Sequence, residues 1–325
     1  MTRLRLALAI GAAAGVAAAS TAALAHFTSS TASSGNTFAA APDFVAPTAS
    51  SLAIGKTQGG EADFIRQGGS YHAYGNASDT GNPASGVASM TGDVGLGSFA
   101  MPSGSFTFAG VSYGHRSGSL TAPNPYSAGT KTLTTTLTDA AGNSRQTTHD
   151  FIVDNTAPTA SDVQTADGSG NAGQAGLGDT ITFTFSEPID RHSIISGWLP
   201  STGDPQDCVV RVNNIAGVLG LILAKDELEV YNSANSAKLP LGTVDLVESN
   251  YVSADRTFGA TGTKSTIARS GNSIVVTLGT ASGSTTDGTS GADMSWSHST
   301  GPFDRAGNGL GSGTVTESGS SDREF

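Results

Sequence analysis

The sequence predicts an all-β protein made of two β-sandwich domains in tandem. Only 13% of its residues are charged, about half of the roughly 25% usual in soluble proteins, while 43 are glycine. The apolar runs are short and alternate with polar residues, which is typical of half-buried strands. Two motifs each occur twice, at a spacing of ordinary domain size. Beyond the first 25 residues no long segment has the 3.6-residue period of an amphipathic helix.

The chain begins with the pattern of a secretory signal peptide. Arg3 and Arg5 precede an apolar, alanine-rich run, and Ala23-Leu24-Ala25 has the small-x-small form that signal peptidase accepts. We expect residues 1–25 to be removed, the protein to be extracellular or at the cell surface, and the mature chain to lack a transmembrane segment. The net charge of −11 disfavours nucleic acid as a partner and favours cations.

Residues 26–45 form a polar leader. His26-Phe27-Thr28 followed by Gly35-Asn36-Thr37-Phe38-Ala39 resembles the signal region of bacterial matrix-fibre proteins of the TasA and camelysin type, which the SipW-type signal peptidase processes. The resemblance covers about 20 residues. It implies export and association with an extracellular matrix, and it does not extend to the fibre domain of that family.

The two repeated motifs divide the rest of the chain. Val45-Ala46-Pro47-Thr48-Ala49-Ser50 matches Thr156-Ala157-Pro158-Thr159-Ala160-Ser161, and Asp139-Ala140-Ala141-Gly142-Asn143 matches Asp304-Arg305-Ala306-Gly307-Asn308. The first motif opens each domain and the second lies near its end. We therefore expect a first domain at 46–156, a larger second domain at 157–317 with extra material between Ser193 and Ala237, and a tail at 318–325.

Alternating apolar and polar residues, bounded by Gly, Asn, Asp and Pro, predict the strands of both domains. In the first domain the best strand signals are at 70–74, 105–108, 131–138 and 147–153. In the second domain they are at 180–185, 208–212, 228–231, 244–247 and 273–278. The continuous apolar run 218–223 fits either a buried strand or one helical turn.

The end of the first domain resembles the terminal strand and linker of bacterial Ig-like repeats. Those repeats carry a D-x-x-G-N turn, a strand, and then D-N-T-A-P; here these are Asp139–Asn143, Phe151–Val153 and Asp154–Pro158. The resemblance implies two tandem Ig-like sandwiches of the kind found in adhesins. The second domain departs from it by its length and by lacking a closing D-N-T-A-P, so we expect the tandem to stop at two.

Acidic and amide side chains in these turns suggest a calcium site. Calcium takes six to eight oxygen ligands. Two readings stay open, because Asp and Asn in a D-x-x-G-N sequence also cap turns through their own backbone. Asp162 and Asp167, which follow the junction in the second domain, are further possible ligands. The candidate ligands are Asp139, Asn143, Asp154 and Asn155 at the domain junction, with Asp304 and Asn308 as weaker equivalents at the far end.

The sequence does not indicate an enzyme, and we expect no catalytic residues. Gly110-Val111-Ser112-Tyr113-Gly114 fits G-x-S-x-G, but no helix pattern follows it, as a nucleophile elbow requires. The six histidines are scattered, without a zinc spacing. Leu199-Pro200-Ser201-Thr202-Gly203 fits the sortase pattern, but it lies far from the C-terminus, so we interpret it as a turn.

The remaining chemistry-bearing residues fit a structural protein. Trp198, Trp296 and the single cysteine, Cys208, are expected in the core. We therefore expect a secreted or surface-bound structural and adhesive protein, a semi-rigid rod that presents a binding module to a protein or polysaccharide. A matrix or fibre component is the alternative, and a hydrolase with a catalytic second domain is a third. Pro158, which restricts the backbone at the junction, supports the rod.

Overall fold

The computed structural model of the chain describes residues 43–325, apart from 216, 218–223, 289–290 and 322. The predicted signal peptide, nearly all of the leader and the apolar run 218–223 lie outside the described residues. The described chain is nearly all β, as predicted. Its helices are short: α2 (Arg191–Ile194) and the 3-10 helix η1 (Pro200–Thr202).

The first ten strands form the N-terminal unit, which is built from two five-stranded sheets. One sheet has the order β1-β3-β7-β6, with β8 paired to β3, and the other has the order β2-β10-β9-β4-β5. Strand β2 is parallel to β10, and every other pair is antiparallel. The bounds are β1 (Thr48–Lys56), β2 (Phe64–Ile65), β3 (Ser70–Ser78), β4 (Val87–Asp93), β5 (Ser98–Ala100), β6 (Ser103–Phe108), β7 (Val111–Arg116), β8 (Leu120–Thr121), β9 (Gly129–Asp139) and β10 (Ser144–Val153).

A cluster of buried hydrophobic residues holds these two sheets face to face. Leu133 and Leu137 alternate with threonines along β9, so both leucines point inward and are fully buried. They share a core with Ile54 and Tyr71 from the other sheet, and with Phe151 from β10. Burial of an apolar side chain of this size contributes about 1.5–3 kcal/mol, which is what keeps the sheets together.

The later strands form the C-terminal unit, a ten-stranded sheet with the order β11-β12-β18-β17-β13-β14-β15-β19-β20, in which β16 pairs with β13. The sheet curls so that its two outer strands approach each other. Gln164 Nε2 of β11 donates to Ser318 O at 2.8 Å, just after β20. The bounds are β11 (Ala160–Ala166), β12 (Thr180–Phe185), β13 (Gln206–Ile215), β14 (Lys225–Asn232), β15 (Thr243–Asp245), β16 (Arg256–Phe258), β17 (Ser265–Ser270), β18 (Ser273–Thr277), β19 (Ser295–His298) and β20 (Gly313–Thr316).

The segment expected as extra material, 193–237, is part of this sheet. Its strands β13 and β14 pair along eight residues and lie between β17 and β15. The sheet is therefore continuous and curled like a barrel, where two separate sheets were expected. The strand expected at 180–185 is confirmed with the same bounds as β12.

Both tryptophans and the cysteine fill the core of the C-terminal unit, as expected. Trp296 contacts Phe183 and Phe185 edge-on, with ring centroids 5.0 and 5.4 Å apart, and its indole N–H donates to Leu241 O. Trp198 is equally buried, and its indole N–H donates to Asp204. Burial raises the pKa of the Cys208 thiol to about 12, so this thiol stays protonated.

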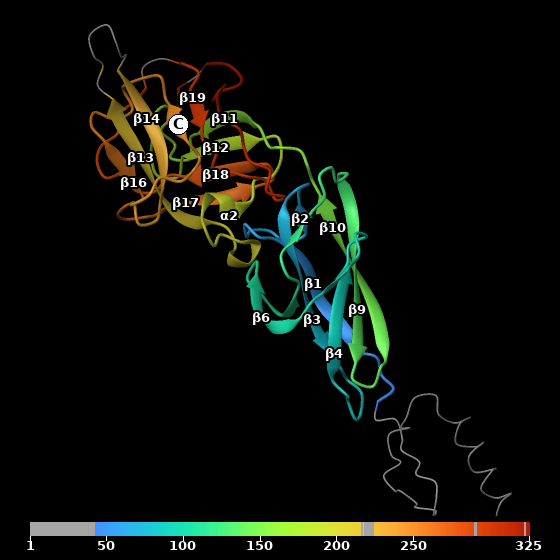
Figure 1. Ribbon diagram of the computed structural model, residues 1–325. Helices are drawn as coiled ribbons and strands as arrows, with labels where there is room; N and C mark the ends of the chain where they lie inside the picture. The colour runs from blue at the N-terminus through green and yellow to red at the C-terminus, as the bar shows by residue number, and fades with distance from the viewer. Residues whose placement is uncertain (1–42, 216, 218–223, 289–290, 322) are drawn as a thin grey trace, which may run out of the picture.

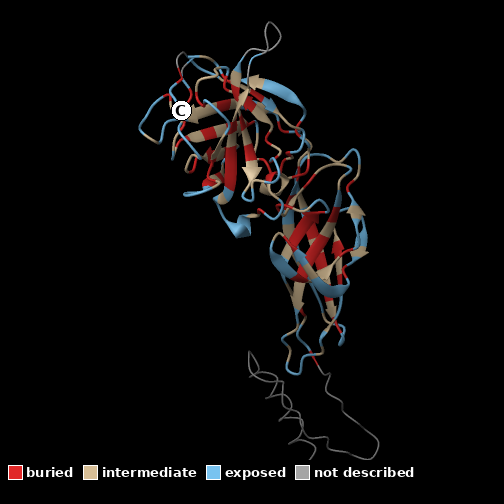
Figure 2. Ribbon diagram, turned by 90° about the vertical axis from the view of Figure 1, so that its left-hand side faces the viewer, coloured by how far each residue is buried: buried red, intermediate tan, exposed pale blue. Residues whose placement is uncertain are grey.

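The two units lie end to end and give the molecule an elongated shape (Figures 1 and 2). Strand β10 ends at Val153, and β11 begins the C-terminal unit after six intervening residues. The buried residues form separate clusters within each unit (Figure 2). Among the described residues, no helix combines the length and the apolar character that a membrane span needs.

Candidate functional site

The D-x-x-G-N sequence builds the same turn at one end of each unit. In the N-terminal unit Asp139 accepts hydrogen bonds from the backbone N–H of Asn143 at 2.8 Å and from its amide at 2.7 Å. In the C-terminal unit Asp304 and Asn308 repeat both bonds at 2.8 Å. The glycine of each turn has a φ near +90°, which only glycine adopts without strain. The D-x-x-G-N motif therefore forms a hydrogen-bonded turn in both units.

The structure groups the candidate ligands differently from the expected order. Asp139 and Asn143 lie at the far end of the N-terminal unit, whereas Asp304 and Asn308 lie at the junction with Asp154. The reason is the length of β10, whose ten residues place Asn143 and Asp154 eleven steps apart, or roughly 37 Å at about 3.4 Å per residue.

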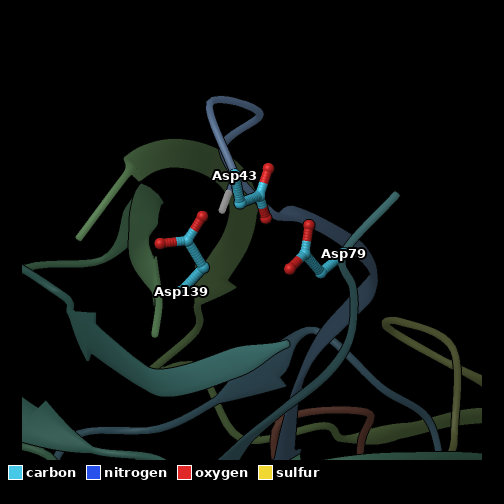
Figure 3. Close-up of side chains that lie close together, drawn as sticks. All are labelled: Asp43, Asp79 and Asp139. Atoms are coloured by element: carbon cyan, nitrogen blue, oxygen red, sulfur yellow. The ribbon is translucent and has the colours of Figure 1, made fainter. Parts of the chain in front are cut away.

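Three aspartates gather at the far end of the N-terminal unit and form the N-terminal cluster, Asp43, Asp79 and Asp139 (Figure 3). They come from three segments: the residues before β1, the loop after β3 and the end of β9. Each offers a carboxylate oxygen within 4.8 Å of the others. The Asn143 amide donates to the Asp43 carbonyl at 3.2 Å. This bond joins the D-x-x-G-N turn to the first residue that the structure describes.

Backbone N–H groups already stabilise the charges of the N-terminal cluster. Asp43 accepts from Val45 N and Ser85 N, both at 2.9 Å, and these bonds hold its pKa below the usual value. Asp79 accepts from Gly86 N at 2.7 Å. The protein itself therefore supplies donors to this cluster.

The second cluster lies between the two units. Asp154 from the linker, Glu187 after β12 and Asp304 have carboxylate oxygens within 4.8 Å of one another, and we call them the junction cluster. Burial, together with the charges of Asp304 and Asp154, raises the pKa of Glu187 from 4.5 to about 7. Burial and Asp154 also raise the pKa of Asp304. Negative charge is thus less well compensated here than in the N-terminal cluster.

This shifted carboxyl group predicts a pH dependence of stability. Glu187 has a pKa of 4.5 when unperturbed and about 7 in the fold, so the folded state binds its proton more tightly than the unfolded state. Its contribution is fully present below pH 4.5 and is lost as the pH rises through 7. In chelator, we expect the free energy of unfolding to fall by about 1–2 kcal/mol over this range, a figure reduced for solvent screening.

Thermal unfolding between pH 4.5 and 7.5 measures this effect. Glu187→Gln should remove most of the fall in unfolding free energy with rising pH. Asp207→Asn, which removes a charge at an exposed position of β13, should leave that fall unchanged. The same pH dependence of the unfolding free energy in the wild-type protein and in Glu187→Gln would contradict its assignment to Glu187.

The other expected neighbours lie outside both clusters. Asn155 accepts from Gln67 N at 2.8 Å and donates to Tyr126 O at 2.7 Å, so its amide fixes a turn of the N-terminal unit. Asp162 accepts from Ser318 N, next to the closing edge of the curled sheet. Asp167 accepts from Gly170 N within its own loop.

A buried ion pair joins the two units. Lys56 Nζ, at the end of β1, lies 2.6 Å from Asp190 Oδ2, and the two side chains are only 4% and 0% exposed. The ammonium also donates to Glu61 O at 3.1 Å and to Arg305 O at 2.7 Å, so all three of its protons are used. Asp190 accepts further from Glu61 N and caps α2 through His192 N.

Glu61 extends this network across the junction. Its carboxylate binds Arg191 at 3.1 Å and Arg269 at 2.5 Å, both from the C-terminal unit. We call Lys56, Glu61, Asp190, Arg191 and Arg269 the junction clamp. Sequence reasoning missed it, because Lys56 and Asp190 are 134 residues apart and neither belongs to a motif.

Sequence reasoning also missed Asp43 and Asp79, although one signal was present. Asp43 precedes Pro47 by the same four residues as Asp154 precedes Pro158. In the structure both aspartates meet the Asn of a D-x-x-G-N turn through their carbonyl oxygens. A comparison of the two repeats extended towards the N-terminus by two residues would have found this equivalence.

The G-x-S-x-G match and the sortase-like match both lie in ordinary secondary structure. Ser112 is an exposed residue of β7, and the chain continues as a strand through Arg116. The Pro200–Thr202 segment is the helix η1, and Ser201 donates to Ala109 O at 3.3 Å, so this turn contacts the N-terminal unit.

No protein-family model matches this chain, and no curated protein matches its sequence.

Proposed function

We propose that this protein is a secreted or cell-surface structural and adhesive protein, a semi-rigid rod in which an Ig-like N-terminal unit holds the curled-sheet C-terminal unit away from a surface. The observation that carries the proposal is the junction clamp. A flexible pair of domains would be joined by an exposed linker, whereas here a lysine and an aspartate are buried between the units.

Further contacts around the clamp support a fixed arrangement. The Arg305 guanidinium lies 4.0 Å from the ring of Phe64, and the Asn308 amide donates to the carbonyl of Asp154 in the linker. Each of these contacts joins a residue of the C-terminal unit to a residue of the N-terminal unit or the linker. Several contacts between different segments of the two units restrict rotation as well as separation.

Calcium at the junction cluster is part of this proposal. A hard cation prefers carboxylate oxygens, and three of them converge here from the linker and from two loops of the C-terminal unit. The raised pKa of Glu187 supports the fit, because a nearby cation would remove the repulsion that raises it. The cation would then tie the linker to the C-terminal unit and stiffen the rod. The N-terminal cluster is a weaker candidate, since backbone donors hold the pKa of Asp43 below its usual value, whereas the pKa values of Glu187 and Asp304 are raised.

Small-angle scattering of residues 26–325 tests the rod. We expect the scattering curve to fit one elongated particle with the arrangement in Figure 1. Lys56→Met should broaden the distribution of distances between the units, and Lys264→Met, at an exposed position, should leave it unchanged. A wild-type curve that needs many arrangements of two freely moving units would contradict the proposal.

A further inference from the structure

A small polar hollow lies at the junction, apart from the junction cluster. Its volume is about 170 Å³. The end of β1, the turn that precedes β3 and one residue of the C-terminal unit, Ala306, line it. None of the three carboxylates of the junction cluster is among the lining residues.

The hollow has a positive lining in a negative protein. Lys56 and Arg66 line it, and no acidic residue does, although the chain has 27 acidic residues against 16 basic ones. The ammonium of Lys56 is fully used by the junction clamp. Arg66 is different: the residue is half-buried, and within the described part of the chain its guanidinium has no hydrogen-bond, ion-pair or ring partner.

The backbone of Arg66 is held rigidly. Gly69 N donates to Arg66 O at 3.1 Å, Gly68 N donates to Ala122 O at 3.1 Å, and Gln67 N donates to Asn155. The guanidinium is therefore presented from a fixed turn, and binding would cost little backbone ordering. A guanidinium forms two parallel hydrogen bonds to a carboxylate in one plane. A carboxylate is therefore the ligand group that suits Arg66 best.

Other lining side chains are neutral hydrogen-bonding groups. Thr57 and Ser70 carry hydroxyls and Gln58 carries an amide, and all three are solvent-accessible. Such groups bind the hydroxyls of a ligand. The volume is well below the roughly 300–1,000 Å³ of pockets for drug-sized molecules, which limits the occupant to about one sugar ring.

We propose that this hollow binds a small hydroxylated carboxylate, with the chemistry of a uronic acid, through Arg66. The carboxylate pairs with the guanidinium, and the ligand hydroxyls face Thr57, Gln58 and Ser70. Because Ala306 lines the hollow, the bound ligand touches both units.

Isothermal titration of residues 26–325 with glucuronate tests this site, in chelator so that calcium cannot bridge the ligand to the protein. We expect glucuronate to bind and Arg66→Gln to weaken it about tenfold or more, the usual loss for a hydrogen-bonded charge. Arg66→Lys keeps the charge but loses the two-bond geometry, so its affinity should fall between the two. Arg145→Gln removes an exposed arginine of β10 and should bind like the wild type.

Glucose and acetate serve as matched ligands, since each lacks one half of the proposed chemistry. Both should bind more weakly than glucuronate. The proposal is wrong if glucuronate gives no binding, if Arg66→Gln binds it as tightly as Arg145→Gln does, or if acetate binds as tightly as glucuronate.

Discussion

Replacing Lys56 with methionine is expected to cost about 3 kcal/mol of unfolding free energy, the lower end of the roughly 3–5 kcal/mol lost when one partner of a buried ion pair is removed. Methionine fills most of the lysine's volume but leaves Asp190 charged and fully buried. The lower end applies because two backbone N–H groups still donate to that carboxylate. Urea unfolding followed by the fluorescence of Trp198 and Trp296 measures the change.

A double-mutant cycle separates the ion pair from the packing around it. Asp190→Asn keeps an oxygen that caps α2, and the double variant Lys56→Met/Asp190→Asn leaves no unpaired charge. We expect it to be more stable than the sum of the two single changes predicts, with a coupling of about 0.5–3 kcal/mol. Lys264→Met, an exposed control, should change stability by less than about 0.5 kcal/mol. Equal losses for Lys56→Met and Lys264→Met would show that the clamp does not hold the units together.

Calcium is expected to stabilise the protein at pH 7.5 by about 2.7 kcal/mol when its concentration is one hundred times the dissociation constant, and to raise the melting temperature by several degrees. The gain comes from relieving the repulsion among Asp154, Glu187 and Asp304, which are close together only in the folded chain. Thermal unfolding in excess calcium and in chelator measures the difference.

Two variants assign the effect to one cluster. Glu187→Gln should lose most of the calcium-induced shift and be more stable than the wild type in chelator, because it removes a repelling charge. Asp79→Asn weakens the N-terminal cluster in the same way and should keep most of the shift, since backbone N–H groups already serve that cluster. A full shift in Glu187→Gln would place calcium elsewhere, and no shift in the wild type would leave both clusters as turn structures alone.

Several parts of the fold follow from short stretches of sequence. The alternation in Thr180–Phe185 sets both the strand and its buried face, because successive side chains of a strand point to opposite sides. The D-x-x-G-N turn is equally local, since its hydrogen bonds join residues four apart and its glycine takes a positive φ. Strands such as β1 escaped prediction, because serines and a glycine interrupt the apolar residues of Thr48–Lys56.

The grouping of the acidic residues did not follow from local patterns. The sequence places Asp139 fifteen positions before Asp154, but the intervening strand β10 carries them to opposite ends of the N-terminal unit. Asp154 instead meets Asp304, because the turn of the second repeat folds back onto the linker that enters its own unit. The continuous sheet of the C-terminal unit is a similar case, since β13 and β14 come from the segment that looked like extra material.

The sequence by itself determined the all-β class, the two repeated turns and the buried face of strands such as Thr180–Phe185, because these depend on side-chain alternation and on bonds between near neighbours. Only the tertiary structure decided which carboxylates share a cluster, that Lys56 pairs with Asp190 and that Arg66 lines a hollow. Lys56 and Asp190 are 134 residues apart, and the hollow brings Arg66 together with Ala306, 240 positions later in the chain (306 − 66). Packing of whole sheets sets such distances, and the spacing of residues along the chain does not contain them.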